Sequence, residues 1–451
     1  MVSNSLIRSD FDKKQKNTVS RIVYLYISML YITVSLAYDV SSIVVKLFVF
    51  FLSTLLIIKI YKLCKRRMSI IGSLVALLCI SMPISFRNVF GGSYAEIPLP
   101  WFYIILIIFI IGSLLKILKD KTKVLPQWSS LLIWLVLASV IPLMVSGNLI
   151  EGFKEFLSYL TFLLGVLGAI IHRNNLVKQE YHELVNFYIF GVIFSSIGII
   201  LQYFTFHHLS AELFRMEFYG GGRVYLSFLF FDMSGITVYM STAILFLILL
   251  KKRMRFTLSI LIILAMTLST ARAGIISLSV VMFIYLVFSS NLKNKIYILL
   301  FLIVGISIGI NILSATRTNI SGLTNILSEN NGRFEPVILT LKAIVKSPLV
   351  GYGYDFGDQL VAVGSVVPHF ALINILGQSG IVIAICYIII VYNIFKIVKS
   401  KKMDSLLWVI TLSLVGSCVS PGFFDLRFFT ILAIIGVLYR REPTIKVDII
   451  P

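Results

Sequence analysis

Fourteen apolar stretches, each close to the length of a membrane-spanning helix, occupy most of this 451-residue chain. About 20 mostly apolar residues cross a bilayer as a helix. The chain is 58% hydrophobic and 13% charged, against about 45–50% and about 25% in soluble domains. We therefore expect an all-α polytopic membrane protein with about 14 spans, or 12–14 if the tight turns around Asp39 and Ala271 or the short last pair do not cross. The stretches lie near 22–38, 40–58, 69–85, 99–117, 127–146, 153–171, 184–206, 226–250, 256–271, 273–289, 296–313, 369–395, 404–420 and 426–439.

The basic residues predict an orientation for these spans. The chain has 40 Lys and Arg against 20 Asp and Glu, a net charge of +20. With the N-terminus in the cytoplasm, 29 of the 40 fall in cytoplasmic segments and the rest outside, as the excess of Lys and Arg in cytoplasmic loops requires. Lys dominates the inner set and Arg the outer one, and a guanidinium suits carboxylate or phosphate groups. We expect both termini in the cytoplasm and no nucleic-acid partner.

The loops divide the chain into four regions. Residues 1–206 and 369–451 are membrane helices, and 207–313 contains helices together with external segments that carry arginines. Residues 314–368 form one large external loop, which is too long for a structureless connection and should contain short helices.

Several classes of function lack their motifs. No GxxxxGK[ST] sequence is present, so nothing indicates an ATP-driven pump. The first external loop is too short to carry the paired acids of a metal-dependent lipid-linked glycosyltransferase, and the only DxD, Asp10–Asp12, lies in a polar tail. We expect neither a metal site nor a cofactor.

Three external arginines have surroundings that suggest an anionic ligand. Arg223 follows three glycines, Arg272 lies in a tight hairpin, and Arg333 lies in the long loop. A charge at membrane depth is costly unless it is paired or solvated, so such residues usually face a polar pathway or a ligand. Arg272 also suits an interface anchor or a partner for Asp232.

The end of the long loop offers a histidine and possible sugar-binding residues. His369 opens a span at the membrane boundary, where it suits either a general base or an interfacial structural histidine. Aromatic rings stack on sugar rings, and carboxylate groups accept hydrogen bonds from sugar hydroxyl groups. The candidates for glycan contact are Tyr352, Tyr354, Asp355 and Glu335.

Taken in order, these motifs resemble the O-antigen polymerase/O-antigen ligase superfamily. The motif-bearing match covers about residues 220–395, and the first 200 residues agree only in being polytopic. This chain departs from the family pattern at Phe370, where Asn often follows the histidine. The matching motifs are Gly-Arg at 222–223, Thr-x-Arg-x-Gly at 270–274, Gly-Arg at 332–333, Pro-Leu-x-Gly-Tyr-Gly at 348–353 and Leu-Gly-x-x-Gly at 376–380, after His369.

The resemblance implies a metal-independent glycosyltransferase of the GT-C type in the bacterial inner membrane. By position, His369 would be the catalytic base, and Arg223, Arg272 and Arg333 would bind the diphosphate of a polyprenyl-linked glycan. A polymerase of repeat units for O-antigen or a related surface polysaccharide is favoured, with a chain-length regulator as a candidate partner. An O-antigen ligase, which transfers glycan to lipid A core, is the nearest alternative. A flippase for lipid-linked oligosaccharides is the alternative from another class.

Overall fold

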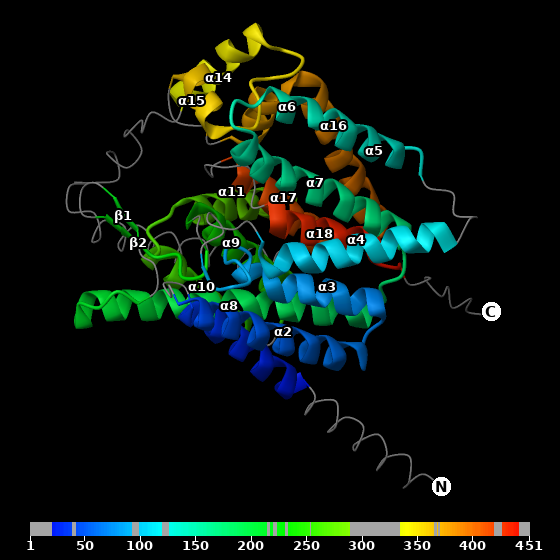
Figure 1. Cartoon of the computed structure of the whole chain (residues 1–451). Helices are drawn as coiled ribbons and strands as arrows, with labels where there is room; N and C mark the ends of the chain where they lie inside the picture. The colour runs from blue at the N-terminus through cyan, green and yellow to red at the C-terminus, as the bar shows by residue number, and fades with distance from the viewer. Residues whose placement is uncertain are drawn as a thin grey trace, which may run out of the picture.

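Apolar helices make up almost all of the structure, a computed structural model (Figure 1). It describes residues 20–37, 42–92, 99–119, 126–213, 217–219, 223–230, 233–252, 254–288, 334–364, 368, 370–418 and 426–441. Among these, five helices are long and apolar enough to cross a membrane: α2 (Ile43–Lys65), α4 (Trp101–Lys119), α7 (Leu149–Ile171), α8 (Lys178–Leu209) and α16 (Ala371–Ser400). The expected class, an all-α membrane protein, is confirmed at this level.

Shorter apolar helices coincide with the other predicted spans, except 296–313, which lies outside the described residues. The number of membrane crossings therefore stays a prediction. These helices are Ser20–Leu36, α3 (Ile70–Ser81) with the 3₁₀ turn η1 (Met82–Ile84), α5 (Ser129–Ala138) with α6 (Val140–Val145), α9 (Met233–Leu249), α10 (Arg255–Leu268), α11 (Ala273–Phe288), α17 (Asp404–Ser417) and α18 (Leu426–Leu438).

Two predicted spans are interrupted. The segment 127–146 is divided into α5 and α6 at Ser139, three residues before Pro142. A proline inside a helix removes one hydrogen bond and clashes with the carbonyl four residues earlier, which accounts for this break. The segment 369–395 is part of α16, which is broken at Gly380 (φ 80°, ψ 173°).

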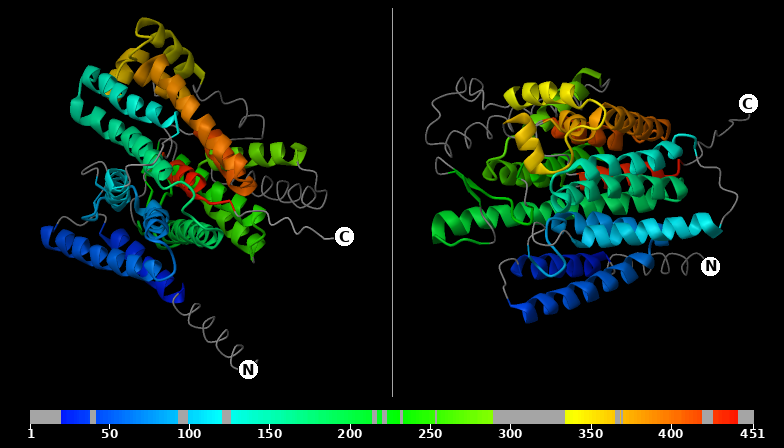
Figure 2. Two further views of the ribbon diagram at one scale, coloured as in Figure 1. Left: turned by 90° about the vertical axis from the view of Figure 1, so that its right-hand side faces the viewer. Right: turned by 45° about the horizontal axis from the view of Figure 1, so that its top comes forward.

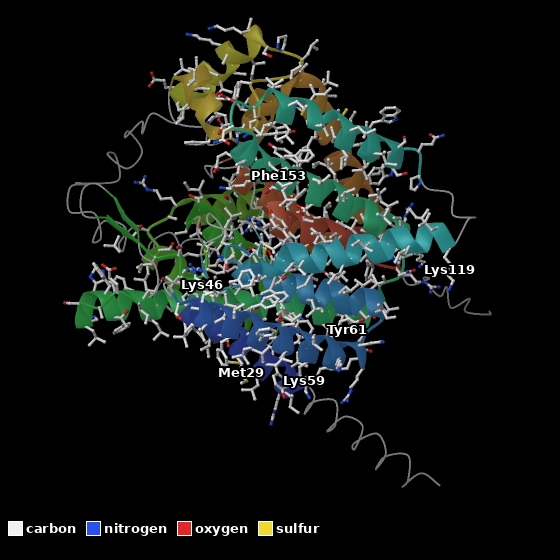
Figure 3. All side chains as sticks on the ribbon, in the orientation of Figure 1. Met29, Lys46, Lys59, Tyr61, Lys119 and Phe153 are labelled. Atoms are coloured by element: carbon white, nitrogen blue, oxygen red, sulfur yellow. The ribbon has the colours of Figure 1, made fainter. Side chains whose placement is uncertain are left out.

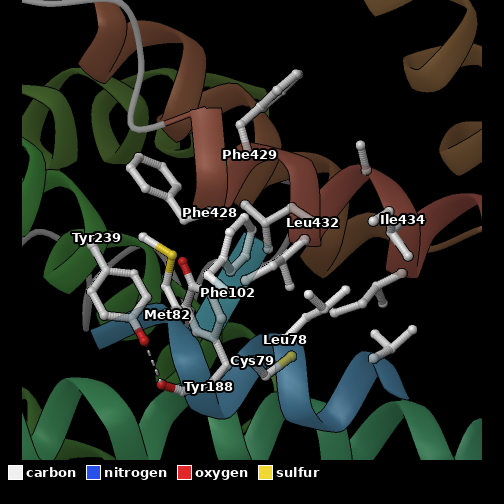
Figure 4. Close-up of a cluster of buried hydrophobic side chains, with 14 of the residues drawn as sticks. Leu78, Cys79, Met82, Phe102, Tyr188, Tyr239, Phe428, Phe429, Leu432 and Ile434 are labelled. Carbon is white, nitrogen blue, oxygen red and sulfur yellow. Dashed lines mark hydrogen bonds between the residues drawn. The ribbon is translucent and has the colours of Figure 1, made fainter. Parts of the chain in front are cut away.

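The helices are stacked in layers, with α2 on one side of the molecule and two short helices, α14 (Phe334–Lys346) and α15 (Phe356–Val363), on the other (Figures 1 and 2). α18 lies in the middle, packed against α7, α16, α17 and α3. Every side chain from Arg427 to Leu438 is buried. Figure 4 shows Phe428 of this helix in the core beside Tyr239 of α9, whose hydroxyl donates to Tyr188 O at 3.2 Å.

The long loop contains short helices, as predicted, and these helices expose apolar side chains beside charged ones. α14 exposes Ile338, Leu341 and Val345, the last 78% exposed, and α15 exposes Val361, 86% exposed. A contiguous exposed apolar surface of this kind marks contact with lipid or protein. A short hairpin of β1 (Glu217–Tyr219) and β2 (Arg223–Tyr225) lies before α9 and pairs Tyr219 with Arg223.

Candidate functional site

Turns that carry many of the basic residues meet at one end of the bundle. Lys401 Nζ donates to the carbonyl oxygens of Gly436 and Val437, at 3.1 and 2.6 Å, which joins the α16–α17 turn to the end of α18. The backbone N–H of Arg440 donates to Leu176 O at 2.7 Å, so the α7–α8 turn lies there too. Figure 3 shows Lys119, at the end of α4, on the side of the molecule away from Lys46. The helices α7, α9, α11, α16 and α18 all begin at the opposite end, which we call the outer end.

Arg427 lies at the outer end in the first turn of α18 and is 7% exposed. Its guanidinium carbon lies 4.0 Å from the ring centre of Phe86 and 5.2 Å from that of Tyr103, and Nη1 donates to Ser85 O. The rings and the carbonyl stabilise the cation. The positive end of the helix dipole and the surrounding apolar helices disfavour it. A buried arginine at a helix N-terminus is typical of a site that receives a negative group.

Two further arginines lie around the start of α9. Arg87 is 5% exposed, and its Nη2 donates to Phe228 O at 2.8 Å. Arg272 is half-buried in the turn before α11. The beginning of α11 is held against α9, because Gly274 N–H donates to Thr237 Oγ1 at 3.1 Å.

The same part of α9 also meets the start of α18, since the rings of Tyr239 and Phe428 lie 6.2 Å apart. The ring of Phe230 stacks on Tyr239 at 5.5 Å, close along the chain to the carbonyl that receives Arg87. Arg87, Arg272 and Arg427 are therefore grouped around the outer end of α9.

Gly274 explains the Thr-x-Arg-x-Gly motif. A Cβ at this position would lie 2.1 Å from the backbone oxygen of Thr237. Only glycine lets the two helices approach this closely, and their approach fixes the turn that carries Arg272. The glycine of this motif therefore has a packing role.

The other predicted site residues are only partly described. The backbone of Arg223 forms the first residue of β2, but its side chain lies outside the described residues. Arg333 and His369 lie outside them as well. Their assignments stay predictions that rest on sequence.

The Pro-Leu-x-Gly-Tyr-Gly segment is docked into the break in α16. The N–H groups of Tyr352 and Gly353 donate to the carbonyls of Gly377 and Gln378 at 2.9 and 3.1 Å. The N–H of the residue after Gly380 donates to Pro348 O at 2.9 Å. The loop thus satisfies backbone groups freed by the break, as membrane-buried irregular backbone requires.

Glycines make this docking sterically possible. At Gly351 (φ +75°) a Cβ would lie 2.4 Å from Gly377 O, and at Gly380 (φ +80°) it would lie 2.2 Å from Leu349 O. At Gly377 it would lie 2.1 Å from the Tyr352 hydroxyl oxygen. The two glycine motifs are therefore two halves of one structural element.

Structural contacts account for two of the proposed glycan-binding residues. Tyr354 is fully buried, its N–H donates to Ser146 Oγ at 2.8 Å, and its ring lies 5.1 Å from that of Tyr159. Asp355 is 8% exposed and caps α15 by accepting from the N–H of Gly357. In this conformation neither side chain presents a free surface to a sugar.

The other two glycan candidates are more accessible. Glu335 is exposed in the first turn of α14, and Tyr352 is half-buried. Burial raises the pKa of Tyr352 to about 12, so its phenol stays neutral at physiological pH. Of the four candidates, these two are the ones that a sugar could reach.

Arg87 and Arg427 are among the basic residues that the predicted orientation places outside, and no sequence motif gives a role to either. Charge counting assigns a residue to a side of the membrane and carries no information on depth. One signal was present in the sequence: Arg427 directly precedes an apolar run that reaches Leu438. A charged residue at the start of a helix buried on all sides destabilises the fold, so its presence there indicates a function.

Comparisons with known proteins add no relative. No protein-family profile matches the chain, and neither a characterised protein nor a solved structure matches it. Function must therefore be argued from the residues themselves.

Proposed function

We propose that this protein polymerises polyprenyl-diphosphate-linked oligosaccharide repeat units at the outer face of a bacterial cytoplasmic membrane. The observation that carries the proposal is the group of arginines around the outer end of α9, two of which are buried. Helix N-termini and arginines together favour a phosphate-bearing ligand. In the proposed topology, fourteen spans of the GT-C type leave both termini in the cytoplasm and this group on the periplasmic side.

The reaction would transfer the growing glycan to a sugar hydroxyl of a new lipid-linked unit. His369 accepts the hydroxyl proton, the hydroxyl oxygen bonds to the anomeric carbon, and the bond from that carbon to the diphosphate oxygen breaks. The electron pair leaves with the polyprenyl diphosphate, where negative charge accumulates. Fixed cations stabilise such charge without reorganisation, and losing one such donor typically costs about 100- to 1,000-fold in rate.

Arg223, Arg272 and Arg333 are the arginines that the family resemblance assigns to the diphosphate. Arg272 belongs to the group around α9, and we add Arg87 and Arg427 to the proposed set. Arg427 is buried in the first turn of α18, where the residues from Phe428 to Leu438 are buried as well. Arg272 lies nearer the surface, in a half-buried turn. This arrangement suits a ligand that extends from the membrane surface into the outer end of the bundle.

The decisive experiment is elongation of defined lipid-linked repeat units by the purified protein in detergent. A polymerase lengthens the units without a sealed membrane, whereas a flippase needs two compartments and leaves their length unchanged. A ligase would instead need lipid A core as the acceptor. His369→Ala should lower elongation by about 100- to 10,000-fold while the protein still binds the lipid-linked donor. A His369→Ala protein that makes long polymer at the normal rate would remove the base assignment.

The arginine assignment has its own matched comparison. Arg272→Lys keeps the charge but loses the planar fork of donors that pairs with two phosphate oxygens. It should therefore reduce elongation more than Lys342→Ala, which removes a charge from the exposed surface of α14. Equal tolerance of both substitutions would argue against an anionic site at Arg272.

A further inference from the structure

One acidic side chain lies on the inward surface of a membrane helix and is nevertheless accessible. Glu155 of α7 shares its helical face with Tyr159, Phe162 and Val166, four, seven and eleven residues further on, all of them buried. The lipid-facing side of α7 is the opposite one, represented by Phe153, which is 48% exposed (Figure 3). Glu155 therefore points into the bundle.

Glu155 is exposed although protein surrounds it densely. Glu151, one turn earlier on the same face, is exposed as well, whereas Tyr159, one turn later, is buried, so an open space extends along this face of α7 from its outer end to Glu155. The space is near the outer end, because Glu155 is in the second turn of α7, which begins at the Asn148 cap. Tyr159 and Tyr354 are near enough to interact electrostatically with the carboxyl group, so they belong to its immediate surroundings.

Arg427 is near enough to Glu155 for its positive charge to interact electrostatically with the carboxyl group. The two are also linked through α4: the guanidinium of Arg427 lies over the Tyr103 ring, and the Tyr103 hydroxyl is 3.0 Å from the hydroxyl of Ser158, one turn after Glu155. Within the described part of the chain, Glu155 makes neither a hydrogen bond nor an ion pair. The carboxyl group of Glu155 and the guanidinium of Arg427 thus lie at the same space without forming an ion pair with each other.

We propose that Glu155 and Arg427 form a binding site for a sugar that carries an anionic group, with Glu155 accepting hydrogen bonds from sugar hydroxyls. A carboxyl group offers two oxygens that accept hydrogen bonds, which suits a ligand rich in hydroxyl groups. Arg427 binds the phosphate of the same ligand. The inference rests on the proposed function, and it identifies where the glycan next to the diphosphate is held. Glu155 is a binding residue, and the proton acceptor remains His369.

The first test measures access to the space and needs no catalytic activity. In a background in which the four native cysteines are replaced, Glu155→Cys is reconstituted in nanodiscs and treated with a charged methanethiosulfonate reagent. It should react at least about tenfold faster than Phe162→Cys, which lies on the same face but is buried. Undecaprenyl-diphosphate-linked oligosaccharide should slow the labelling, and undecaprenyl phosphate without sugar should slow it less. Equal, slow labelling of both cysteines would overturn the open space, and equal protection by both lipids would overturn the sugar contact.

The second test compares two acids on the same helix. Hydrogen bonds to a charged group contribute about 1.5–3 kcal/mol, so Glu155→Gln should raise the KM for the lipid-linked oligosaccharide by about 10- to 150-fold and change kcat less. Glu151→Gln is the matched control, since Glu151 lies one turn earlier and pairs with Lys154 at 2.8 Å on the exposed surface. Its KM should stay unchanged.

The outcomes separate the inference from the proposed function. If the wild-type protein elongates and Glu155→Gln behaves like Glu151→Gln, the sugar site is wrong and the polymerase stands. If the wild-type protein does not elongate, the polymerase proposal fails. In that case the labelling and its protection by the sugar-bearing lipid still decide whether Glu155 binds a glycan.

Discussion

Replacing Gly380 with alanine tests the idea that the loop and the broken helix α16 are one element. At φ 80° and ψ 173° the backbone is in a region that is essentially restricted to glycine, where a side chain costs about 1–3 kcal/mol. The new Cβ would also lie 2.2 Å from Leu349 O, a backbone atom that cannot rotate away. The loop must shift, and the shift breaks the hydrogen bond from Ile381 N–H to Pro348 O.

The expected loss can be estimated from these parts. Backbone strain of about 1–3 kcal/mol and about 1 kcal/mol for each of one or two lost hydrogen bonds give a destabilisation of about 2–5 kcal/mol. Gly364→Ala is the matched control. Gly364 also has a positive φ of 66°, but a Cβ there meets no atom within 4 Å. This substitution should lower the free energy of unfolding by only about 1–2 kcal/mol, because alanine is less stable than glycine in the left-handed conformation.

Thermal unfolding in detergent, followed with a thiol-reactive fluorogenic dye, measures the difference. Cys386 and Cys418 are accessible in the folded protein and are first replaced by serine; Cys64 and Cys79 are buried, so the dye then reports loss of the helix packing. The unfolding midpoint of Gly380→Ala should be below that of Gly364→Ala, which should itself be only slightly below that of the wild type. Equal midpoints for the two variants would refute the argument that close backbone contact holds the loop to α16.

Three other predictions follow from the same structure. Burial, with a smaller contribution from Arg173, lowers the pKa of Lys401 from its ordinary 10.5 to about 7. Between these two pH values the unfolded chain therefore binds more protons than the folded one, and the stability of the fold should rise with pH from about 7 to about 10.5. Lys401→Met should flatten that rise in unfolding midpoints measured across this range, and an unchanged slope would contradict the assignment. Val345→Cys carrying an environment-sensitive fluorophore should show a blue-shifted spectrum, quenched by brominated lipids, if α14 rests on the bilayer, and a water-like spectrum would exclude that contact. Gly274→Ala should lower the unfolding midpoint by separating α9 from α11, whereas Gly112→Ala, which meets no atom within 4 Å, should not, and equal effects would contradict the close approach.

Helix positions could be predicted from the sequence because burial in lipid and burial in protein both select long apolar runs. The break between α5 and α6 also had a visible cause in Pro142. The break at Gly380 did not, because glycine occurs in intact membrane helices and the segment 369–395 is mostly apolar, with no Asp, Glu, Lys or Arg. The break is explained by the loop that bonds to the freed carbonyls. In the sequence this loop is separated from the break by α15, so the pairing of the two cannot be seen there.

Glu155 shows why the site was harder to predict than the fold. Its spacing from Tyr159 and Phe162 was readable, but the pattern does not reveal which side of α7 faces protein. An amphipathic pattern tells a helix face in water from a face in apolar surroundings. In a membrane bundle the protein-facing and lipid-facing sides are both apolar, so the pattern does not tell them apart. The direction of Glu155 follows only from the burial of its neighbours and the exposure of Phe153.

The motif residues in Pro348–Gly353 and Gly377–Gly380 contact one another, so the resemblance they carry is first of all a resemblance of scaffold. Substituting their glycines would displace the loop and so lower any activity that depends on it, whatever the reaction is. Loss of activity at these positions therefore cannot identify chemistry. The scaffold does constrain the site, because the hydroxyl of Tyr159 donates to Gln378 Oε1 at 2.6 Å and so fixes the outer part of α16 to α7, four residues from Glu155. Position 369 directly precedes the Phe370 cap of that outer part. A clamp that holds the outer end of α16 against the helix that carries Glu155 would set the distance between Glu155 and the proposed base at position 369, the two groups that the proposed sugar must bridge.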